Sequence, residues 1–297
     1  MKNFKKIRKA IITAAGYGTR FLPATKNQPK EMLPIIDMPI IHYLVQEAVD
    51  SGIEQIIIVN RFGSHPVEDY FDNHSELEYV LKESGKEHYL KMIQDIPKMA
   101  NFVYVRQKKH MPYGNGTPLL ASKDLIDDDE AFVYMFGDDV TLSDKKPVTK
   151  QLIDVYQEYK PSAVLGVQEV PWDEIHKYGS VEYKKDADYK YEISQVLEKL
   201  PKDKAPSNMA QFGRFVLTYD VINAMEKAST GIGGELWLTD VLNNLAKEGK
   251  KVIAQPIKGE WLTTGDPLRY LKTTLKFAMQ REDLKEELLK YIKEEII

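Results

Sequence analysis

The residues of this chain with the clearest chemical potential begin with a glycine-containing turn near the N-terminus. The turn, Ala14-Ala15-Gly16-Tyr17-Gly18-Thr19-Arg20, consists mainly of small residues, which let backbone N–H groups approach a nucleotide. A dinucleotide-binding loop would need a third glycine where Phe21 stands, and a P-loop would end in Gly-Lys-Ser/Thr. The turn by itself is weakly diagnostic, because many glycine pairs are only tight connections.

Two adjacent carboxylates, Asp138 and Asp139, form the second chemical feature. They follow the hydrophobic run Phe132–Phe136, which places them at the end of a predicted strand. Hard oxygen ligands of this kind suit Mg²⁺, which also keeps waters and binds substrate phosphates. Two adjacent acids at a strand end can equally form a turn or a helix cap. The residue types alone leave both readings open.

The elements that must position these residues alternate between strands and helices in the first half of the chain. Continuous apolar runs indicate strands covered on both faces, and they occur at 10–13, 56–59, 102–105 and 132–136. Between the first two, residues 40–49 repeat at helical spacing and end at Ser51-Gly52. This alternation predicts an α/β fold with a mainly parallel sheet and a ligand site at the carboxyl ends of its strands.

The pattern changes after about residue 160. Strands are predicted at 162–170, 179–183, 193–198 and 211–217, followed by a helix at 235–247. We expect this part to lay a smaller mixed sheet over the first. From Pro267 onwards an amphipathic helix is predicted, broken near Arg281-Glu282. The sequence shows no flexible linker, so we expect one unit, 1–297, with parts at about 1–160, 161–265 and 266–297.

Composition excludes several classes of protein. The 41 basic and 45 acidic residues are interspersed and give a formal net charge of −4, which does not indicate nucleic-acid binding. The absence of cysteine excludes disulfides, thiolate zinc sites and cysteine nucleophiles, and fits a reducing cytoplasm. The apolar run at 10–15 is too short for a signal-peptide core or a membrane span. We therefore expect a soluble cytoplasmic protein with no nucleic-acid or membrane partner.

A further motif begins nine residues after Arg20, where residues 29–34 read Pro-Lys-Glu-Met-Leu-Pro. With this motif the sequence resembles the sugar-nucleotide pyrophosphorylases, most closely the bacterial UTP–glucose-1-phosphate uridylyltransferases. Those enzymes open with a strand, an Ala-Ala-Gly-x-Gly-Thr-Arg loop and the same Pro-Lys-Glu-Met-Leu-Pro motif. The similarity continues in order through nearly the whole chain, at 137–139, 178–179, 198–199, 205–208, 213–214 and 233–240.

The resemblance implies a fold and a reaction. The implied fold is the Rossmann-like α/β fold of nucleotidyltransferases, which is glycosyltransferase A-like. It has a central mixed, mostly parallel sheet flanked by helices and a smaller β-rich subdomain that binds the sugar. The reaction joins UTP and glucose 1-phosphate into UDP-glucose and pyrophosphate with Mg²⁺, by in-line attack on the α-phosphorus. On this basis 1–160 is the nucleotide-binding half, 161–265 the sugar-phosphate half and 266–297 a helical segment. Homo-oligomers, dimers or tetramers, are usual in the family.

The resemblance also implies roles for single residues. Arg20 and Lys30 stand in the places that the family uses for phosphate contact, and Asp138 in the place of a metal ligand. Sugar-phosphate binding is implied for Gly179, Glu198, Lys199 and Gly213. In the nucleotide site, Gln107 is the implied base-reading residue, and its amide can donate and accept at once, as a uracil edge requires. The other implied nucleotide-binding residues are Ala14, Ala15, Gly16, Gly18, Thr19, Glu31 and Gly114.

Three departures from the family pattern bear on activity. The spacing from Gln107 to Gly114 is longer than usual, and Trp237 stands where glutamine is usual. Thr263 replaces the aspartate that completes the metal site, and a hydroxyl is a far poorer Mg²⁺ ligand than a carboxylate. Asp266 is not a compensation, because the family commonly has an aspartate there as well. The alternatives are therefore a slow enzyme, an enzyme for another sugar or nucleotide such as dTTP, or a paralogue that binds without turnover.

Overall fold

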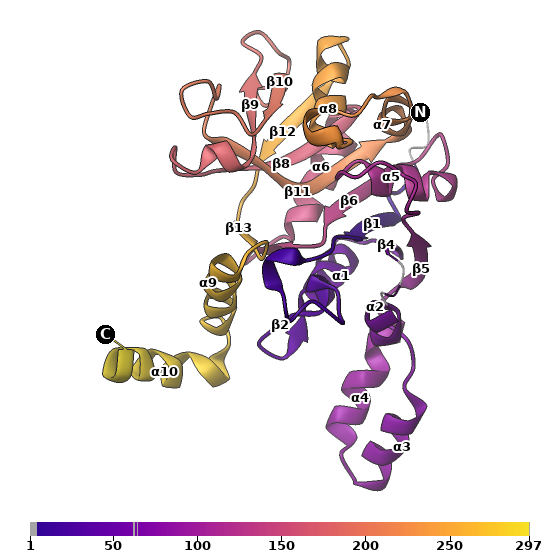
Figure 1. Cartoon of the computed structure of the whole chain (residues 1–297), viewed down its shortest axis with the longest axis vertical. Helices are drawn as coiled ribbons and strands as arrows, with labels where there is room; N and C mark the ends of the chain where they lie inside the picture. Colours follow the sequence, from indigo (N-terminus) through magenta and orange to yellow (C-terminus); the bar gives the residue numbers. More distant parts are fainter. Residues whose placement is uncertain (1–4, 62, 64, 297) are drawn as a thin grey trace.

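The computed structural model describes residues 5–61, 63 and 65–296. Its centre is a nine-stranded sheet with the order β10-β9-β11-β6-β1-β4-β5, in which β8 pairs with β11 and β12 pairs with β8 (Figure 1). Two small pairs, β2 with β3 and β7 with β13, lie outside it. The strands are β1 (Lys9–Ala14), β2 (Pro34–Ile35), β3 (Met38–Pro39), β4 (Gln55–Asn60), β5 (Asn101–Arg106), β6 (Ala131–Phe136), β7 (Asp139–Leu142), β8 (Ala163–Glu169), β9 (Gly179–Tyr183), β10 (Ile193–Glu198), β11 (Met209–Thr218), β12 (Val252–Pro256) and β13 (Glu260–Thr263).

The first half of the chain forms the parallel part of the sheet. Strand β1 pairs in parallel with β4 and β6, and β4 pairs in parallel with β5. The carboxyl ends of these strands therefore share one edge, where Ala14 is opposite Asn60 and Asn60 is opposite Arg106. The predicted βα arrangement is confirmed here.

The second half does not form a separate layer, so the expectation of a smaller sheet laid over the first is wrong. Strand β11 pairs antiparallel with β6, with Phe215 opposite Tyr134, and thereby extends the same sheet. The physical reason is the edge of β6: an unpaired edge would expose backbone N–H and C=O groups. Strand β11 is buried from Ala210 to Leu217, so it suits a central position. The fold class predicted from the sequence, a mixed sheet flanked by helices, is confirmed.

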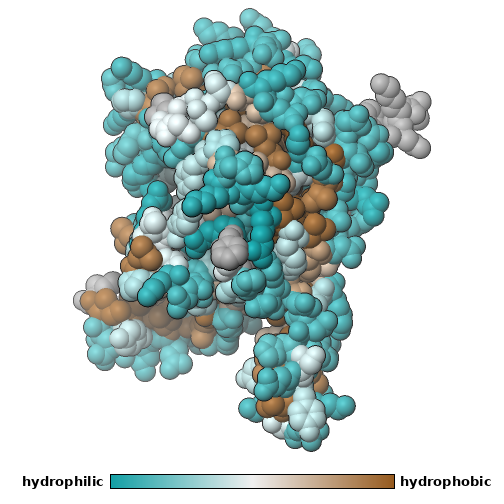
Figure 2. All heavy atoms as spheres, turned by 45° about the vertical axis from the view of Figure 1, so that its right-hand side comes forward, coloured by the Kyte–Doolittle hydropathy of each residue, from teal (hydrophilic) through white to brown (hydrophobic). Residues whose placement is uncertain are grey.

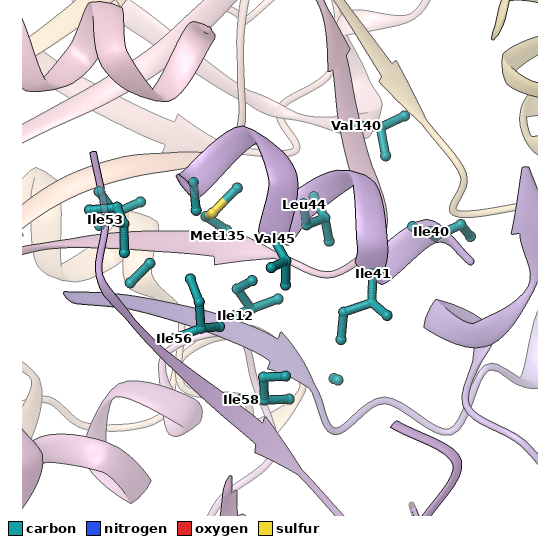
Figure 3. Packing of buried hydrophobic residues seen from close by; sticks show 14 of the residues in the cluster. Ile12, Ile40, Ile41, Leu44, Val45, Ile53, Ile56, Ile58, Met135 and Val140 are labelled. Carbon is teal, nitrogen blue, oxygen red and sulfur yellow. The ribbon is translucent and has the colours of Figure 1, made fainter. Parts of the chain in front are cut away.

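Helices cover both faces of the sheet. Successive side chains of a strand point to opposite faces. Ile12 therefore packs against α1 (Figure 3), while Ile11 belongs to a core on the other side with residues of α5, α7 and α8. The helices are α1 (Ile40–Asp50), α2 (His65–Tyr70), α3 (Ser75–Glu83), α4 (Glu87–Asp95), α5 (Thr117–Ser122), α6 (Val148–Tyr159), α7 (Tyr219–Lys227), α8 (Leu238–Lys247), α9 (Pro267–Ala278) and α10 (Glu282–Tyr291). Short helical turns are η1 (Thr19–Phe21), η2 (Lys30–Met32), η3 (Ile96–Lys98), η4 (Lys123–Leu125), η5 (Ile175–Lys177), η6 (Ile232–Gly234) and η7 (Ile292–Ile296).

Two helical predictions have different outcomes. The break in the C-terminal helix is confirmed, because α9 ends at Ala278 and α10 begins at Glu282. Helix α8 begins at Leu238, three residues later than predicted, because the chain before it is extended at Trp237. Gly233, inside the preceding turn η6, has a φ of 72°, in the left-handed region, and so interrupts the helical backbone there. In the described part of the chain, no helix is long and apolar enough to cross a membrane.

Two helical pairs project from the body, α3 with α4 and α9 with α10 (Figure 1). Figure 2 shows hydrophobic side chains among hydrophilic ones on the projecting C-terminal part. The exposed apolar side chains of α9 and α10 are Leu268, Leu271, Leu275, Leu289 and Tyr291. The sequence-based prediction of a homo-oligomer is neither confirmed nor contradicted by this exposure.

Candidate active site

A cleft of about 630 Å³ brings together several residues that the sequence predicted. Five of them line it: Arg20, Asp138, Gly179, Glu198 and Lys199. They come from both halves of the chain. Arg20 and Asp138 follow β1 and β6, Gly179 begins β9, and Glu198 and Lys199 lie at and directly after the end of β10. The cleft is closed on a further side by Trp237 and by residues from β13 and the start of α9.

Lys30 and Asp138 form an ion pair beside this cleft. The distance from Lys30 Nζ to Asp138 Oδ2 is 2.5 Å, and their side chains are 19% and 25% exposed. Burial alone would lower the pKa of Lys30, but the nearby carboxylates outweigh it and raise that pKa above its usual value. Burial would raise the pKa of Asp138, and Lys30 outweighs it and lowers that pKa. Both groups are therefore charged at neutral pH.

The glycine turn folds closely over Lys30. Gly18 has a φ of 62°, in the left-handed region, and its carbonyl oxygen accepts a hydrogen bond from the Thr25 hydroxyl at 2.8 Å. A Cβ at Gly18 would lie 3.2 Å from the Thr25 side chain and 3.3 Å from Cβ of Lys30. Both the conformation and the space therefore require glycine at this position.

Arg20, Asp138 and Thr263 surround Gly265. Arg20 Nη1 donates to the Gly265 carbonyl oxygen at 3.0 Å. A Cβ at Gly265 would lie 3.3 Å from Thr263 Oγ1 and 3.5 Å from both Arg20 Nη1 and Asp138 Oδ2. Thr263 is thus beside Asp138, where a second metal-binding carboxylate would be useful. Asp266 is engaged elsewhere, because Oδ1 accepts from the backbone N–H of Arg269 at 3.0 Å and caps α9.

The two adjacent aspartates have different environments. Asp139 is buried, and its Oδ1 accepts from Trp261 Nε1 and its Oδ2 from the backbone N–H of Gly213, both at 2.8 Å. Burial, with the neighbouring Asp138, raises the pKa of Asp139 to about 6. Asp138 lies in the turn between β6 and β7 and Asp139 begins β7, so neither aspartate caps a helix. Gly213, a predicted sugar-phosphate residue, uses its N–H to hold Asp139.

A buried ion pair supports this part of the sheet. Arg214 is 0% exposed, and its Nε lies 3.1 Å from each carboxylate oxygen of Glu47. Its Nη2 also donates to the carbonyl oxygen of Asp139 at 2.6 Å. Burial would raise the pKa of Glu47, but Arg214 and two threonine hydroxyls outweigh it and lower that pKa. The guanidinium thus links α1 to the start of β7, directly beside Asp138.

Three of the four predicted sugar-phosphate residues lie together where β9 begins and β10 ends, namely Gly179, Glu198 and Lys199, whereas Gly213 lies within β11. Glu198 Oε2 accepts from the Thr239 hydroxyl at 2.7 Å, and Gln211 Nε2 lies 3.1 Å from the same hydroxyl. Burial is the main cause that raises the pKa of Glu198. A Cβ at Gly179 would lie 3.3 Å from Glu198 Oε2, so the absence of a side chain keeps this carboxylate accessible. Lys199 Nζ is 3.8 Å from Glu198 Oε1.

The predicted base-side residues lie along the carboxyl edge of the parallel strands rather than among the residues that line the cleft. Ala14 ends β1, and the backbone N–H of Gln107 donates to the Asn60 carbonyl oxygen at 2.8 Å. Gly114 has a φ of 135°, and a Cβ there would lie 2.3 Å from the Leu236 carbonyl oxygen. Ala15, Gly16 and Thr19 follow β1 in the same turn as Gly18.

Glu31 is a buried carboxylate in the first half of the chain. It is 1% exposed, and Oε2 has no hydrogen-bond partner among the described residues. Oε1 is 4.0 Å from Lys30 Nζ. Burial raises the pKa of Glu31 to about 7, despite the opposing effect of Lys30. This carboxylate therefore lies behind Lys30, on the side away from solvent.

The described residues do not form a complete set of metal ligands, and Asp138 is the carboxylate among them that could contribute to a metal site. No group of three or more His, Cys, Asp or Glu residues that could hold a metal occurs among them. Asp138 presents a hard, partly exposed carboxylate, and Mg²⁺ characteristically takes one or two carboxylates together with waters and substrate phosphates. The chemistry of this ligand set fits a divalent cation that arrives with phosphate.

Sequence reasoning missed a group of charged residues that line the cleft. They are Glu174, Lys177, Arg269 and Lys272. Arg269 and Lys272 come from the first turns of α9, which begins two residues after Gly265. The sequence predicted this segment only as an amphipathic packing helix. The spacing of three residues between Arg269 and Lys272 places them on one side of a helix that begins beside Gly265, and this spacing would have indicated them.

The comparisons with known proteins agree with this geometry. Residues 9–280 match the nucleotidyl transferase family. The chain is 43% identical over 289 residues to UTP–glucose-1-phosphate uridylyltransferase 2 of Staphylococcus saprophyticus, covering 97% of this chain and 98% of that protein. It is 42% identical over 288 residues to the UTP–glucose-1-phosphate uridylyltransferase of Bacillus subtilis, covering 97% of each.

Solved structures show the same likeness. A UDP-glucose pyrophosphorylase complexed with UDP-glucose has a TM-score of 0.82 and 36% identity, covering 93% of this chain and all (100%) of that one. A UTP-bound enzyme of this type from Acinetobacter baumannii has a TM-score of 0.87 and 31% identity, covering 98% of this chain and 100% of that one. The chain therefore belongs to the nucleotidyl transferase family. Its relatives within that family include the UTP–glucose-1-phosphate uridylyltransferases, as the motifs predicted, and the family generally uses a divalent metal ion.

Proposed function

We propose that this protein makes UDP-glucose and pyrophosphate from UTP and glucose 1-phosphate, with Mg²⁺. The observation that carries the proposal is the Lys30–Asp138 pair at the edge of a cleft that also contains Glu198 and Lys199. The lysine and the carboxylate that would hold a metal ion thus lie beside a cleft in which Glu198 can bind sugar hydroxyls and Lys199 the sugar phosphate. The near-full-length relatives with this activity in their names support it.

The reaction requires two polyanions to meet. An oxygen of the glucose 1-phosphate attacks the α-phosphorus of UTP, the new P–O bond forms, and the bond to the β-phosphate oxygen breaks so that pyrophosphate leaves with the electron pair. Arg20 offers a planar fork to phosphate oxygens, and Lys30 a mobile point charge. Lys30 keeps its proton throughout, because the carboxylates around it raise its pKa.

Mg²⁺ bound with the triphosphate would neutralise charge that develops on the leaving pyrophosphate. Asp138 is the residue that would hold it. Thr263, with its hydroxyl on the same side of Gly265, would contribute at most a weak ligand. Asp139 holds Gly213 and Trp261 and so fixes the turn that presents Asp138.

The remaining predicted residues sort into two binding sites. Glu198 receives the sugar hydroxyls and Lys199 the sugar phosphate, with Gly179 leaving room beside them and Gly213 acting through Asp139. Gln107 reads the uracil edge, and Ala14, Ala15, Gly16, Gly18, Thr19, Glu31 and Gly114 shape the nucleotide site. We accordingly assign 1–160 to the nucleotide and 161–265 to the sugar phosphate, and we expect a cytoplasmic homo-oligomer.

A substrate panel tests the proposal. Pyrophosphate release is measured with UTP, dTTP, ATP, CTP and GTP, each combined with glucose 1-phosphate and other sugar 1-phosphates, with and without Mg²⁺. UTP with glucose 1-phosphate should give the highest kcat/KM, and removal of Mg²⁺ should abolish release. A higher kcat/KM for dTTP or another sugar contradicts the substrate assignment. Binding of UDP-glucose without any release in the panel would indicate a paralogue that binds without turnover.

A further inference from the structure

Trp237 is a residue of the cleft that the proposed mechanism leaves without a task. It directly precedes α8 and lines the same cleft as Glu198 and Lys199. The Nζ atom of Lys199 lies 4.3 Å from the centroid of the Trp237 ring. At this distance the negatively polarised face of the indole attracts the ammonium group, which is a cation–π interaction.

We propose that Trp237 is a positioning residue, which holds the ammonium group of Lys199 where it meets the phosphate of the sugar 1-phosphate. The inference rests on the proposed function, because it takes Lys199 as the cation that receives this phosphate. It adds a residue that acts on the sugar phosphate through another side chain.

Lys199 benefits from such a contact because its side chain is only partly restrained. It is 50% exposed, and its ion pair with Glu198, at 3.8 Å, is longer than a charge-assisted hydrogen bond of about 2.7 to 2.9 Å. A free lysine side chain loses much rotamer entropy when it fixes on an anion. The ring contact removes part of that freedom before the substrate binds, so less is lost on binding.

The backbone at both residues is fixed by hydrogen bonds. The N–H groups of Leu236 and Leu238, on either side of Trp237, donate to the Tyr113 carbonyl oxygen at 2.7 Å and to Asn115 Oδ1 at 2.8 Å. Lys199 has a φ of 49°, in the left-handed region that is uncommon for lysine, and its N–H donates to the Tyr178 carbonyl oxygen at 3.0 Å. The ring and the ammonium group are thus both directed by anchored backbone.

An aromatic ring also differs from a carboxylate in what it does to the charge. A second carboxylate would neutralise the ammonium group and compete with the incoming phosphate. The indole face attracts the cation while leaving its full positive charge and its N–H donors available to phosphate oxygens. This makes the contact suitable for an anion-binding lysine.

Steady-state kinetics with both substrates varied test the proposal. Trp237→Leu should raise KM for glucose 1-phosphate about 5- to 10-fold and leave KM for UTP within about twofold. The reason is that the substitution removes only the ring contact that positions Lys199. Trp237→Phe keeps an aromatic face and should stay within about threefold of wild type for both. In a Lys199→Met background, Trp237→Leu should have no further effect. Equal rises in both KM values, a Phe variant as poor as the Leu variant, or additive effects in the double variant would each overturn it.

A second measurement separates this inference from the proposed function. In protein labelled with ¹³C at the lysine ε-carbon, the ε-methylene signal of Lys199, assigned by Lys199→Arg, should be shifted upfield by the indole ring and should lose that shift in Trp237→Leu. Titration with glucose 1-phosphate should move this signal at lower concentration in wild type than in Trp237→Leu. If the wild type binds glucose 1-phosphate in this way but releases no pyrophosphate with any substrate pair, the proposed function fails and the positioning role stands. A Lys199 signal without an upfield shift, or equal titrations, overturns the positioning role whatever the activity.

Discussion

Lys30 and Asp138 are 108 residues apart in the chain, yet Nζ of one lies 2.5 Å from Oδ2 of the other. The sequence indicated them for separate tasks, phosphate contact and metal binding. In the structure each is the other's partner, with Glu31 behind Lys30 at 4.0 Å. A phosphate-bound cation that reaches Asp138 therefore meets a lysine already held beside it.

We expect Asp138→Asn and Lys30→Met each to lower kcat for pyrophosphate release by about 10²- to 10³-fold, by analogy with the loss of a donor that acts in the transition state. Lys30→Met removes a positive charge that faces the developing pyrophosphate, and Asp138→Asn removes the carboxylate that would hold the Mg²⁺. Lys82→Met, on the projecting helix α3, is the matched control and should keep wild-type kcat. Retention of more than about a tenth of the activity by either site variant would contradict the assignment.

Thr263→Asp should lower the Mg²⁺ concentration needed for half-maximal rate. Thr263 Oγ1 lies on the same side of Gly265 as Asp138, so an aspartate would add a second carboxylate to the metal position. The aspartate can also keep the hydrogen bond from the Gly265 N–H, which Oγ1 now accepts at 3.3 Å. The measurement is a Mg²⁺ titration of the rate, with Thr263→Asn as the uncharged control. Identical titrations of the Asp and Asn variants would show that the metal site is built differently.

Glu47→Gln should lower the free energy of unfolding by about 3 to 5 kcal/mol, because it leaves the buried Arg214 without its countercharge. Arg214 is 0% exposed, so water cannot replace the lost partner. Glu260→Gln breaks an exposed pair with Lys276 and is the control, with an expected change of about 1 kcal/mol or less. Urea unfolding at neutral pH measures both. Equal effects of the two substitutions would mean that burial does not decide the strength of these pairs.

The same pair predicts a loss of stability in acid. The pKa of Glu47 is lowered in the folded protein from its usual 4.5, so its stabilising contribution is complete above that value and is lost as pH falls through the folded pKa. Urea midpoints measured between about pH 3 and 7 should fall more steeply at the acid end in wild type than in Glu47→Gln. Parallel curves for the two proteins would contradict a charged Glu47.

The strands β1, β4 to β6 and β8 to β11 and the helices α1, α8, α9 and α10 were predictable because local patterns set them, whereas α2 to α7, β2, β3, β7, β12 and β13 were not predicted. Continuous apolar runs gave β1, β4, β5 and β6 to within one residue at each end, and the C-terminal break fell where it was predicted. Strand pairing was not predictable in the same way, because it depends on which edges are left open. The antiparallel pairing of β11 with β6 therefore appeared only in three dimensions.

For the site, the sequence determined the residue types that phosphate and metal chemistry need, and their ordered motifs determined the family. Tertiary structure decided what each side chain does in its surroundings. Asp138 and Asp139 are indistinguishable as letters, but one is partly exposed beside Lys30 and the other is buried between Trp261 and Gly213. Likewise the contact between Trp237 and Lys199 joins two segments far apart in the chain. Burial and contacts between distant segments determine the protonation state of a side chain and which groups it can touch. Both depend on the whole fold and cannot be read from the residue type at a single position.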